Sequence, residues 1–259
     1  MKIIKNIIKS IPGTVALHRT FLKFLELKKE RINYVRQWQR ESTTSITNQD
    51  EYDFIRARNL LTYTKVSGKT YRAVEYPAGY HTLSIKGHEL VGQRNPNKRL
   101  KNIPIDFTGK RVLDIGSNQG GMLFSIADKI EWGIGLDYDP RLVNVANAIA
   151  KINKYSNLDF YLFDVDKEPL EMIFDFLPDP HRVDVIFLLS VNVWFSKWEE
   201  LIKLASQTGA IVVVEINGDQ ERQDRDEKYL YELFNKVVMV ATTSEDDPVH
   251  KRKMFVCEQ

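Results

Sequence analysis

From residue 110 onward, short apolar runs alternate with stretches in which apolar residues recur at helical spacing. This alternation predicts a doubly wound α/β fold, in which helices cover both faces of a mostly parallel sheet. The seven predicted strands span residues 111–115, 133–137, 158–163, 183–189, 210–215, 236–241 and 252–257. The polar residues 242–251 are too few for a crossover helix, so the last two strands are predicted to be antiparallel.

The first part of the chain has a different pattern. Apolar residues at helical intervals predict a helix over residues 15–40, and a second helix should carry Phe54, Ile55 and Leu60. Residues 63–103 mix glycine, proline and aromatic residues, which is typical of short strands and ordered loops. We therefore expect N-terminal helices and a lid or substrate segment over residues 1–104, and a core over residues 105–259.

Isoleucines recur at helical spacing in residues 1–11, where Lys5 and Lys9 interrupt the apolar run. The interruptions come too early for a secretory signal peptide and favour an amphipathic helix. Such a helix most often packs on its own protein. The alternative is a weak contact with a membrane surface.

Composition adds few constraints. The chain is 43% hydrophobic and 28% charged, as expected for a globular protein, and its net charge of +2 favours no strongly charged partner. Cys257 is the single cysteine, which excludes an internal disulfide and a multi-cysteine zinc site. A cytoplasmic location is therefore expected.

A glycine-rich turn follows the first strand of the predicted core, where residues 112–121 carry Asp114, Gly116 and Gly120. Glycines let the backbone approach a ligand closely, and the N-terminus of the next helix favours a negatively charged group. Dinucleotide-binding proteins use the same device, so the turn alone is a weak signal. Asp137 and Asp164 end the next two strands, and the three acids should share the ligand-binding edge of the sheet.

With these motifs, residues 105–259 resemble the class I S-adenosylmethionine-dependent methyltransferase family. The resemblance implies that Asp114, Gly116 and Gly120 hold the methionine part of the cofactor, while Asp137 binds the ribose and Asp164 binds the adenine. Further cofactor contacts are expected from residues beside these motifs, namely Ser117, Asn118, Tyr138, Val165 and Ser190. Asn118 stands where the family usually has a glycine. Asparagine tolerates a left-handed backbone, so the turn should survive.

Methyl transfer is an in-line displacement that needs a base only when the acceptor is a neutral hydroxyl or amine. Tyr80 and His81 lie in the segment expected to cover the cofactor, and His81 is our candidate base. His181 should lie at the opposite edge of the sheet, and His250 is more simply explained as a solvated loop residue.

Three further residues are candidates for substrate binding. Arg94, with Arg99 nearby, could contact an anionic group, and the alternative is a solvated basic loop. Glu215 ends a predicted strand close to Asn217, and both could bind a hydroxyl group. We expect no metal, because we can place too few clustered carboxylates for one.

The function expected from these features is methyl transfer to an oxygen of a small molecule or glycan. Residues 76–81 and 92–96 resemble segments that precede the core in bacterial methyltransferases that modify surface sugars. RNA methylation is the alternative, although the near-neutral charge does not favour a nucleic-acid partner. A third possibility, a protein that binds the cofactor without catalysis, is disfavoured by the strand-end acids.

Overall fold

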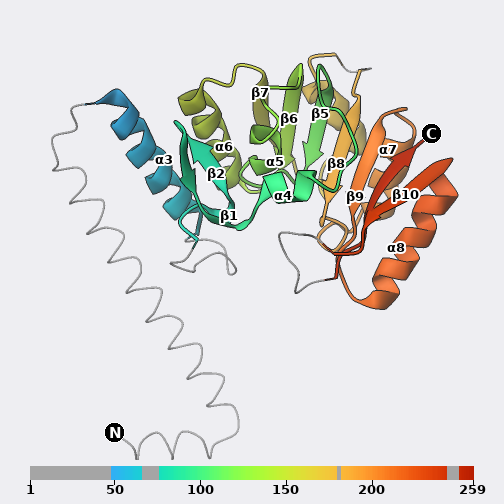
Figure 1. Cartoon of the computed structure of the whole chain (residues 1–259). Coiled ribbons are helices and arrows are strands. Elements are labelled where there is room, and N and C mark those ends of the chain that lie inside the picture. The colour runs from blue at the N-terminus through green and yellow to red at the C-terminus, as the bar shows by residue number, and fades with distance from the viewer. Residues whose placement is uncertain (1–47, 66–75, 180–181, 244–250) are drawn as a thin grey trace, which may run out of the picture.

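The computed structural model describes residues 48–65, 76–179, 182–243 and 251–259 (Figure 1). The predicted helix over residues 15–40, the predicted amphipathic segment over residues 1–11, and both His181 and His250 lie outside these ranges.

A seven-stranded sheet of order β10-β11-β9-β8-β5-β6-β7 forms the centre of the described structure. Its strands are β5 (Arg111–Ile115), β6 (Trp132–Asp137), β7 (Leu158–Leu162), β8 (Val185–Leu189), β9 (Ile211–Glu215), β10 (Lys236–Ala241) and β11 (Met254–Glu258). Strands β5 to β9 pair in parallel, whereas β11 runs antiparallel to both β9 and β10. The predicted fold class and the antiparallel final pair are therefore confirmed.

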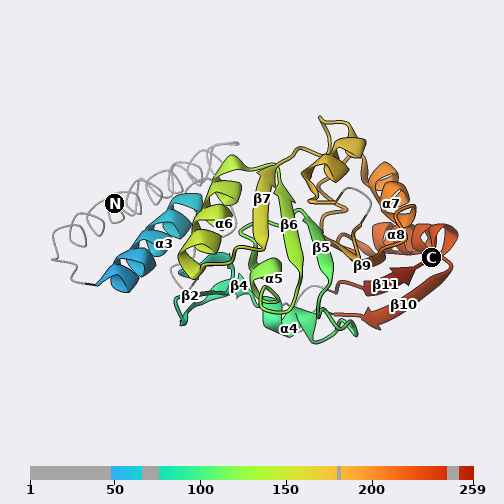
Figure 2. The same ribbon diagram turned by 90° about the horizontal axis from the view of Figure 1, so that it is seen from above.

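Helices cover the sheet on both faces, as Figure 2 shows from above. Strand β8 illustrates the reason, because all five of its residues are buried. Val185 and Phe187 point to the core shared with α3 (Gln49–Lys65), α5 (Gly121–Phe124) and α6 (Pro140–Asn153). Ile186 and Leu188 point to the core shared with η1 (Leu170–Phe176), α7 (Trp198–Ser206) and α8 (Gln220–Leu233).

Helices α3 and α6 pack side by side at the β7 end of the sheet (Figures 1 and 2). Helix α3 is the predicted second helix, and it buries Ala57 and Leu61 in the core. Helix α6 starts at the carboxyl edge of the sheet, where the Asp139 carboxylate accepts a hydrogen bond from the Arg141 amide at 2.8 Å. The Arg141 guanidinium lies 5.1 Å from the centre of the Tyr63 ring, which links the two helices by a cation-π contact.

Residues 79–94 form the four short strands β1 (Gly79–His81), β2 (Leu83–Ile85), β3 (His88–Leu90) and β4 (Gly92–Arg94). Strands β1 and β4 pair in parallel and β2 and β3 form a hairpin, so the predicted short strands are confirmed. One difference is α4 (Pro96–Leu100), a short helix where we predicted only strands and loops. Asn95 caps it by accepting a hydrogen bond from the Lys98 amide, and Pro96 supplies a favourable first residue.

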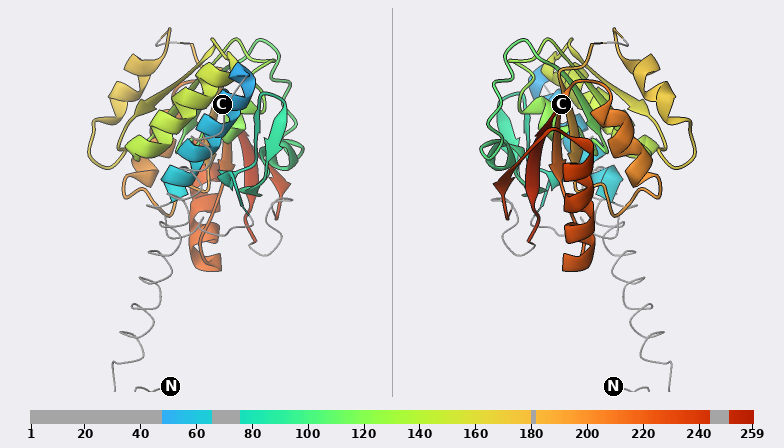
Figure 3. Two further views of the ribbon diagram at one scale, coloured as in Figure 1. Left: turned by 90° about the vertical axis from the view of Figure 1, so that its left-hand side faces the viewer. Right: turned by 90° about the vertical axis from the view of Figure 1, so that its right-hand side faces the viewer.

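This short-strand segment lies against the core and is not separate from it. Strand β1 contacts α3, β2 contacts α6, and α4 contacts α5. Figure 3 shows the short strands, in teal, beside the rest of the ribbon. The short-strand segment, which precedes the core in sequence, thereby lies next to α5. Among the described helices, none is long and apolar enough to cross a membrane.

Candidate functional site

The turn after β5 forms the centre of the candidate site. The backbone amides of Gly116 and Ser117 both donate to the Leu136 carbonyl, at 2.8 and 2.9 Å, which joins the turn to the end of β6. Gly116, Asn118 and Gly120 have positive φ angles of 81°, 53° and 79°. Asn118 therefore adopts the left-handed backbone that we predicted for it.

The structure leaves no room for a side chain at position 116. A Cβ atom at this position would lie 2.4 Å from Cγ1 of Val191, which follows β8. No side chain fits in that space, and the positive φ angle separately disfavours one. The turn after β5 and the loop after β8 consequently lie in direct contact at the carboxyl edge of the sheet.

Asp137 fixes the shape of this turn. Its Oδ2 accepts a hydrogen bond from the Asn118 amide at 2.8 Å, and its Oδ1 accepts one from the Asp139 amide at 2.9 Å. Burial raises the pKa of Asp137 to about 6, although the backbone hydrogen bonds oppose that rise. Asp137 is 6% exposed, so only a ligand at the turn itself could reach it.

Asp114 is more deeply buried at the end of β5. Burial raises its pKa to about 7, against the opposing charge of Arg99. Within the described structure, Oδ2 of Asp114 and Oγ of Ser117 are buried and have no hydrogen-bond partner. Buried polar atoms are nearly always paired in proteins, so two such atoms at one turn indicate a place where a polar ligand binds.

The other predicted cofactor residues lie along the same edge. Asp164 follows β7, and its carboxylate accepts a hydrogen bond from the Lys167 ammonium at 2.6 Å, which lowers its pKa. Tyr138 follows β6 and is 63% exposed. Val165 has its side chain in the apolar core, so only its backbone could contact a ligand at this edge.

Glu215 and Ser190 belong to a buried polar cluster behind the turn. The Glu215 carboxylate is fully buried and receives a bidentate pair of hydrogen bonds from Arg99, at 2.9 and 2.7 Å. Arg94 approaches the same carboxylate at 3.4 Å, and Arg252 at 3.7 Å. The Ser190 hydroxyl also donates to Glu215. Burial acts to raise the pKa of Glu215, but Arg99, Arg94 and Ser190 together lower it.

This cluster changes the roles that can be assigned to two predicted substrate residues. Arg94 and Arg99 are 1% and 2% exposed, so the alternative of a solvated basic loop is wrong. Arg94 and Glu215 face each other rather than open solvent, so neither side chain is exposed to a substrate in this structure. Asn217 lies apart from them, where its amide donates to the Asn192 side chain at 2.9 Å.

His81 and Tyr80 reach the turn from β1. The backbone amides of both residues donate to Oε1 of Gln119, at 3.3 and 3.2 Å, and Nε2 of Gln119 donates to Thr64 of α3 at 3.1 Å. Gln119 thus ties the turn to β1 and α3. It lies within the glycine-rich motif, but its function in bridging these elements was not predicted.

The His81 imidazole is 3% exposed and lies against Gly121, the first residue of α5. In the part of the chain that the structure describes, neither of its ring nitrogens has a hydrogen-bond partner. Burial, reinforced by the positive charges of Arg99 and Arg94, lowers the pKa of His81 well below 6.5. The ring is therefore neutral at pH 7, with one of its two nitrogens unprotonated.

Taken together, the turn fits a ligand that has both hydrogen-bond donors and acceptors. It offers backbone amides, unpaired oxygens on Asp114 and Ser117, and the Asp137 carboxylate. S-adenosylmethionine, the cofactor implied by the resemblance, carries an amino group, a carboxylate and ribose hydroxyls that suit these partners. The described residues contain no cluster of three or more histidine, cysteine, aspartate or glutamate side chains that could hold a metal.

Comparisons with known proteins agree with this fold. The bifunctional kinase-methyltransferase WbdD has a similar structure, with a TM-score of 0.55 and 21% identity over 72% of this chain and 44% of that one. EvdMO1 is similar with a TM-score of 0.53 and 14% identity, over 83% of this chain and 49% of that one. The chain therefore spans less than half the length of either protein. No curated protein sequence matches it.

The family comparison is more specific. Residues 106–252 match the family described as "Methyltransferase domain", and this match spans more than half of the 259 residues. It covers the turn after β5 and all three strand-end acids, Asp114, Asp137 and Asp164. The chain belongs to this family, and its fold is that of the class I S-adenosylmethionine-dependent methyltransferases.

Proposed function

We propose that the chain transfers a methyl group from S-adenosylmethionine to an oxygen atom of a small molecule or glycan. The observation that carries the proposal is a neutral, buried imidazole beside the cofactor turn, since His81 contacts Gly121. An acceptor hydroxyl must lose its proton during transfer, and a neutral imidazole is a common base for that step.

The residues along the carboxyl edge have distinct roles in this proposal. Asp137 binds the ribose hydroxyls, and Asp164 lies where the adenine amino group is expected. Asp114, Ser117 and the amides of the turn hold the methionine part. When bound, the cofactor supplies an electrophilic methyl group attached to a positively charged sulfur.

Tyr80 and His81 act on the acceptor. Tyr80 is more exposed than His81, and the centres of the two rings lie 4.6 Å apart. We assign to Tyr80 the contact that orients the acceptor and to His81 the acceptance of its proton. In this assignment the two residues align the acceptor with the methyl group, which an in-line displacement requires.

A surface polysaccharide or its precursor is the acceptor class that we favour. Its support is the resemblance of residues 76–81 and 92–96 to segments of sugar-modifying bacterial enzymes. RNA methylation has no comparable support from the described residues. A cytoplasmic location stays a prediction, and a weak membrane contact through residues 1–11 stays the alternative to a helix packed on the protein.

Calorimetric titration with S-adenosylmethionine and with its demethylated product tests the cofactor assignment. We expect saturable binding of both compounds, and binding of neither would refute the proposal. A mass-shift screen with isotopically labelled cofactor, applied to polysaccharide precursors and to a set of structured RNAs, then tests the acceptor class. Label transferred only to RNA would favour the alternative.

A further inference from the structure

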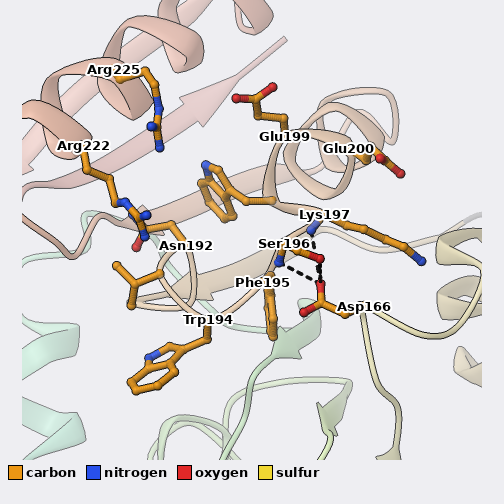
Figure 4. Close-up of a pocket in the computed structure, with 12 residues that line it drawn as sticks. Asp166, Asn192, Trp194, Phe195, Ser196, Lys197, Glu199, Glu200, Arg222 and Arg225 are labelled. Carbon is orange, nitrogen blue, oxygen red and sulfur yellow. Dashed lines mark hydrogen bonds between the residues drawn. The ribbon is translucent and has the colours of Figure 1, made fainter.

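A cavity of about 580 Å³ lies beside the candidate site, at the carboxyl ends of β8 and β9 (Figure 4). Its walls are the loop over residues 192–197, the first turn of α7, the N-terminal half of α8, and Asp166 after β7. None of the cofactor residues assigned above lines this cavity. It therefore has room for a second ligand.

The cavity shares a wall with the cofactor turn. The loop that lines it begins after Ser190, a non-glycine residue with a φ angle of 62°. Phe195 of this loop lines the cavity, and its Cζ lies 3.8 Å from the position that a Cβ atom of Gly116 would take. Only the Phe195 ring therefore separates this part of the cavity from the turn.

Hydrogen bonds hold the loop in place. The Asn192 side chain donates to the Asn217 carbonyl at 2.8 Å and to the Asp226 carboxylate at 2.7 Å. Oδ1 of Asp166 accepts hydrogen bonds from the amide and hydroxyl of Ser196, at 2.8 and 2.9 Å. The cavity wall is therefore preformed, as in most small-molecule sites.

Trp194 projects from this loop into solvent, with 73% of its surface exposed. Figure 4 shows its ring on the side of the loop away from α8. A tryptophan offers a large, flat and rigid apolar face on which a ligand ring can stack. The C–H face of a sugar ring matches such a surface.

Arg222 adds a positive charge. Figure 4 shows it extending from α8 toward Asn192. Among the described residues, its guanidinium has no ion pair, whereas the neighbouring Arg225 pairs with Asp226 at 3.0 Å. An unpaired guanidinium that lines a cavity is suited to bind a phosphate or carboxylate in a bidentate manner.

The acidic residues of the cavity restrict the ligand further. Glu199 and Glu200 lie on its rim and are exposed. Carboxylates accept hydrogen bonds from sugar hydroxyls but repel the repeated phosphates of a nucleic acid. Lys197 also lines the cavity, and its ammonium donates to the Glu168 carbonyl at 2.9 Å. Arg222 beside two exposed carboxylates therefore suits a polyhydroxylated molecule with a single anionic group.

We propose that this cavity binds a sugar unit of the acceptor that carries a phosphate or carboxylate, stacked on Trp194 and paired with Arg222. The proposal rests on the function proposed above and names the acceptor class more closely. The anionic group binds Arg222, the sugar hydroxyls face Glu199 and Glu200, and another part of the acceptor reaches the turn beyond Phe195.

Direct binding measurements test this proposal without an activity assay. Glucose 6-phosphate, glucuronate, methyl glucoside, inorganic phosphate and hexauridylate are titrated into the full chain and followed by calorimetry or protein-observed NMR. The variants are Trp194→Ala, Trp194→Phe and Arg222→Gln. Arg182→Gln is the matched control, because Arg182 is an exposed arginine that precedes β8 and lies away from the cavity.

We expect glucose 6-phosphate to bind more tightly than either methyl glucoside or inorganic phosphate. Arg222→Gln should weaken its binding about tenfold, the usual effect of losing a hydrogen bond to a charged group. Trp194→Ala should weaken the binding of all three sugars (glucose 6-phosphate, glucuronate and methyl glucoside), whereas Trp194→Phe should retain most of the affinity. Arg182→Gln should leave every affinity unchanged.

Three results would overturn the proposal: no saturable sugar binding, equal sugar binding by all variants, or binding of hexauridylate alone. Titration of the demethylated cofactor is run in parallel, and the three cavity variants should bind it normally. Loss of cofactor binding by the unaltered chain would contradict the proposed function, whereas loss of sugar binding alone would contradict only this inference.

Discussion

The imidazole of His81 packs directly on the backbone of Gly121. A Cβ atom at position 121 would lie 2.5 Å from both Cβ and Cγ of His81. Position 121 therefore has to be glycine because of His81, which lies 40 positions earlier in the chain. The contact places the proposed base at the first turn of α5.

The first prediction concerns this contact. Gly121→Ala should lower the free energy of unfolding by about 1–3 kcal/mol, the usual cost of overpacking a close contact. Denaturant unfolding measures this change. His81→Gly serves as the partner variant, because it removes the clashing side chain. In the double variant the two effects should be less than additive, and full additivity would show that the contact contributes nothing.

His81→Ala should leave cofactor affinity unchanged and lower turnover by about 10² to 10⁴, the range for losing a general base. Because the pKa of His81 lies well below 6.5, its protonation should not limit the rate near neutral pH. The rate of the unaltered enzyme should fall only at a pH well below 6.5. Near-normal turnover of the variant at every pH would remove His81 from the reaction.

Asp137→Ala should weaken cofactor binding by about 1.5–3 kcal/mol, because hydrogen bonds to a charged group are lost. Calorimetry measures the effect, and Asp137→Asn separates the charge from the shape of the turn. Asp159→Asn, an exposed position on β7, is the control. If a folded Asp137→Ala variant bound the cofactor as tightly as the unaltered protein, Asp137 would not be the residue that binds the ribose.

Asp114 should make the ligand-free protein less stable as the pH rises. Its pKa is raised from 3.8 to about 7 in the folded state, so the folded protein holds this proton more tightly than the unfolded chain. The resulting stabilisation is complete below a pH of about 4 and is lost as the pH rises to about 7.

Asp114→Asn should therefore raise the free energy of unfolding at pH 8 by about 2–4 kcal/mol, and the gain should shrink toward pH 4. Urea unfolding at the two pH values checks this expectation. Asp128→Asn, at an exposed position, is the control. A gain of equal size at both pH values would show that the ionisation of Asp114 is not its cause.

Glu215→Gln should destabilise the protein by about 3–5 kcal/mol, because it leaves buried arginine charge without its main counter-ion. Thermal unfolding compares it with Asp184→Asn, which alters the more exposed pair of Asp184 with Arg111 at 2.7 Å. We expect a clearly smaller effect for the second variant. Equal effects would show that burial does not control the contribution of the Glu215 cluster.

Most of the core could be predicted from local pattern. The limits of β5 and β10 match the predicted residues 111–115 and 236–241. Asp114 and Asp137 share one edge because parallel strands place their carboxyl ends together. Asn118 adopts a left-handed backbone within a single turn. Each of these features depends on neighbouring residues or on one general rule of sheet geometry, so the sequence alone determines them.

The environment of the candidate site was decided by tertiary structure. Arg94 and Arg99 pair with Glu215 across 121 and 116 positions, and Gln119 joins β1 to the turn across 38. From the sequence pattern, Arg94 and Arg99 could equally belong to a solvated basic loop. They are buried instead, because α4 packs against α5 and carries Arg99 to the end of β9. Local pattern specifies strands and turns. Which distant side chains meet depends on how several elements pack at once, and that arrangement exists only in the folded chain.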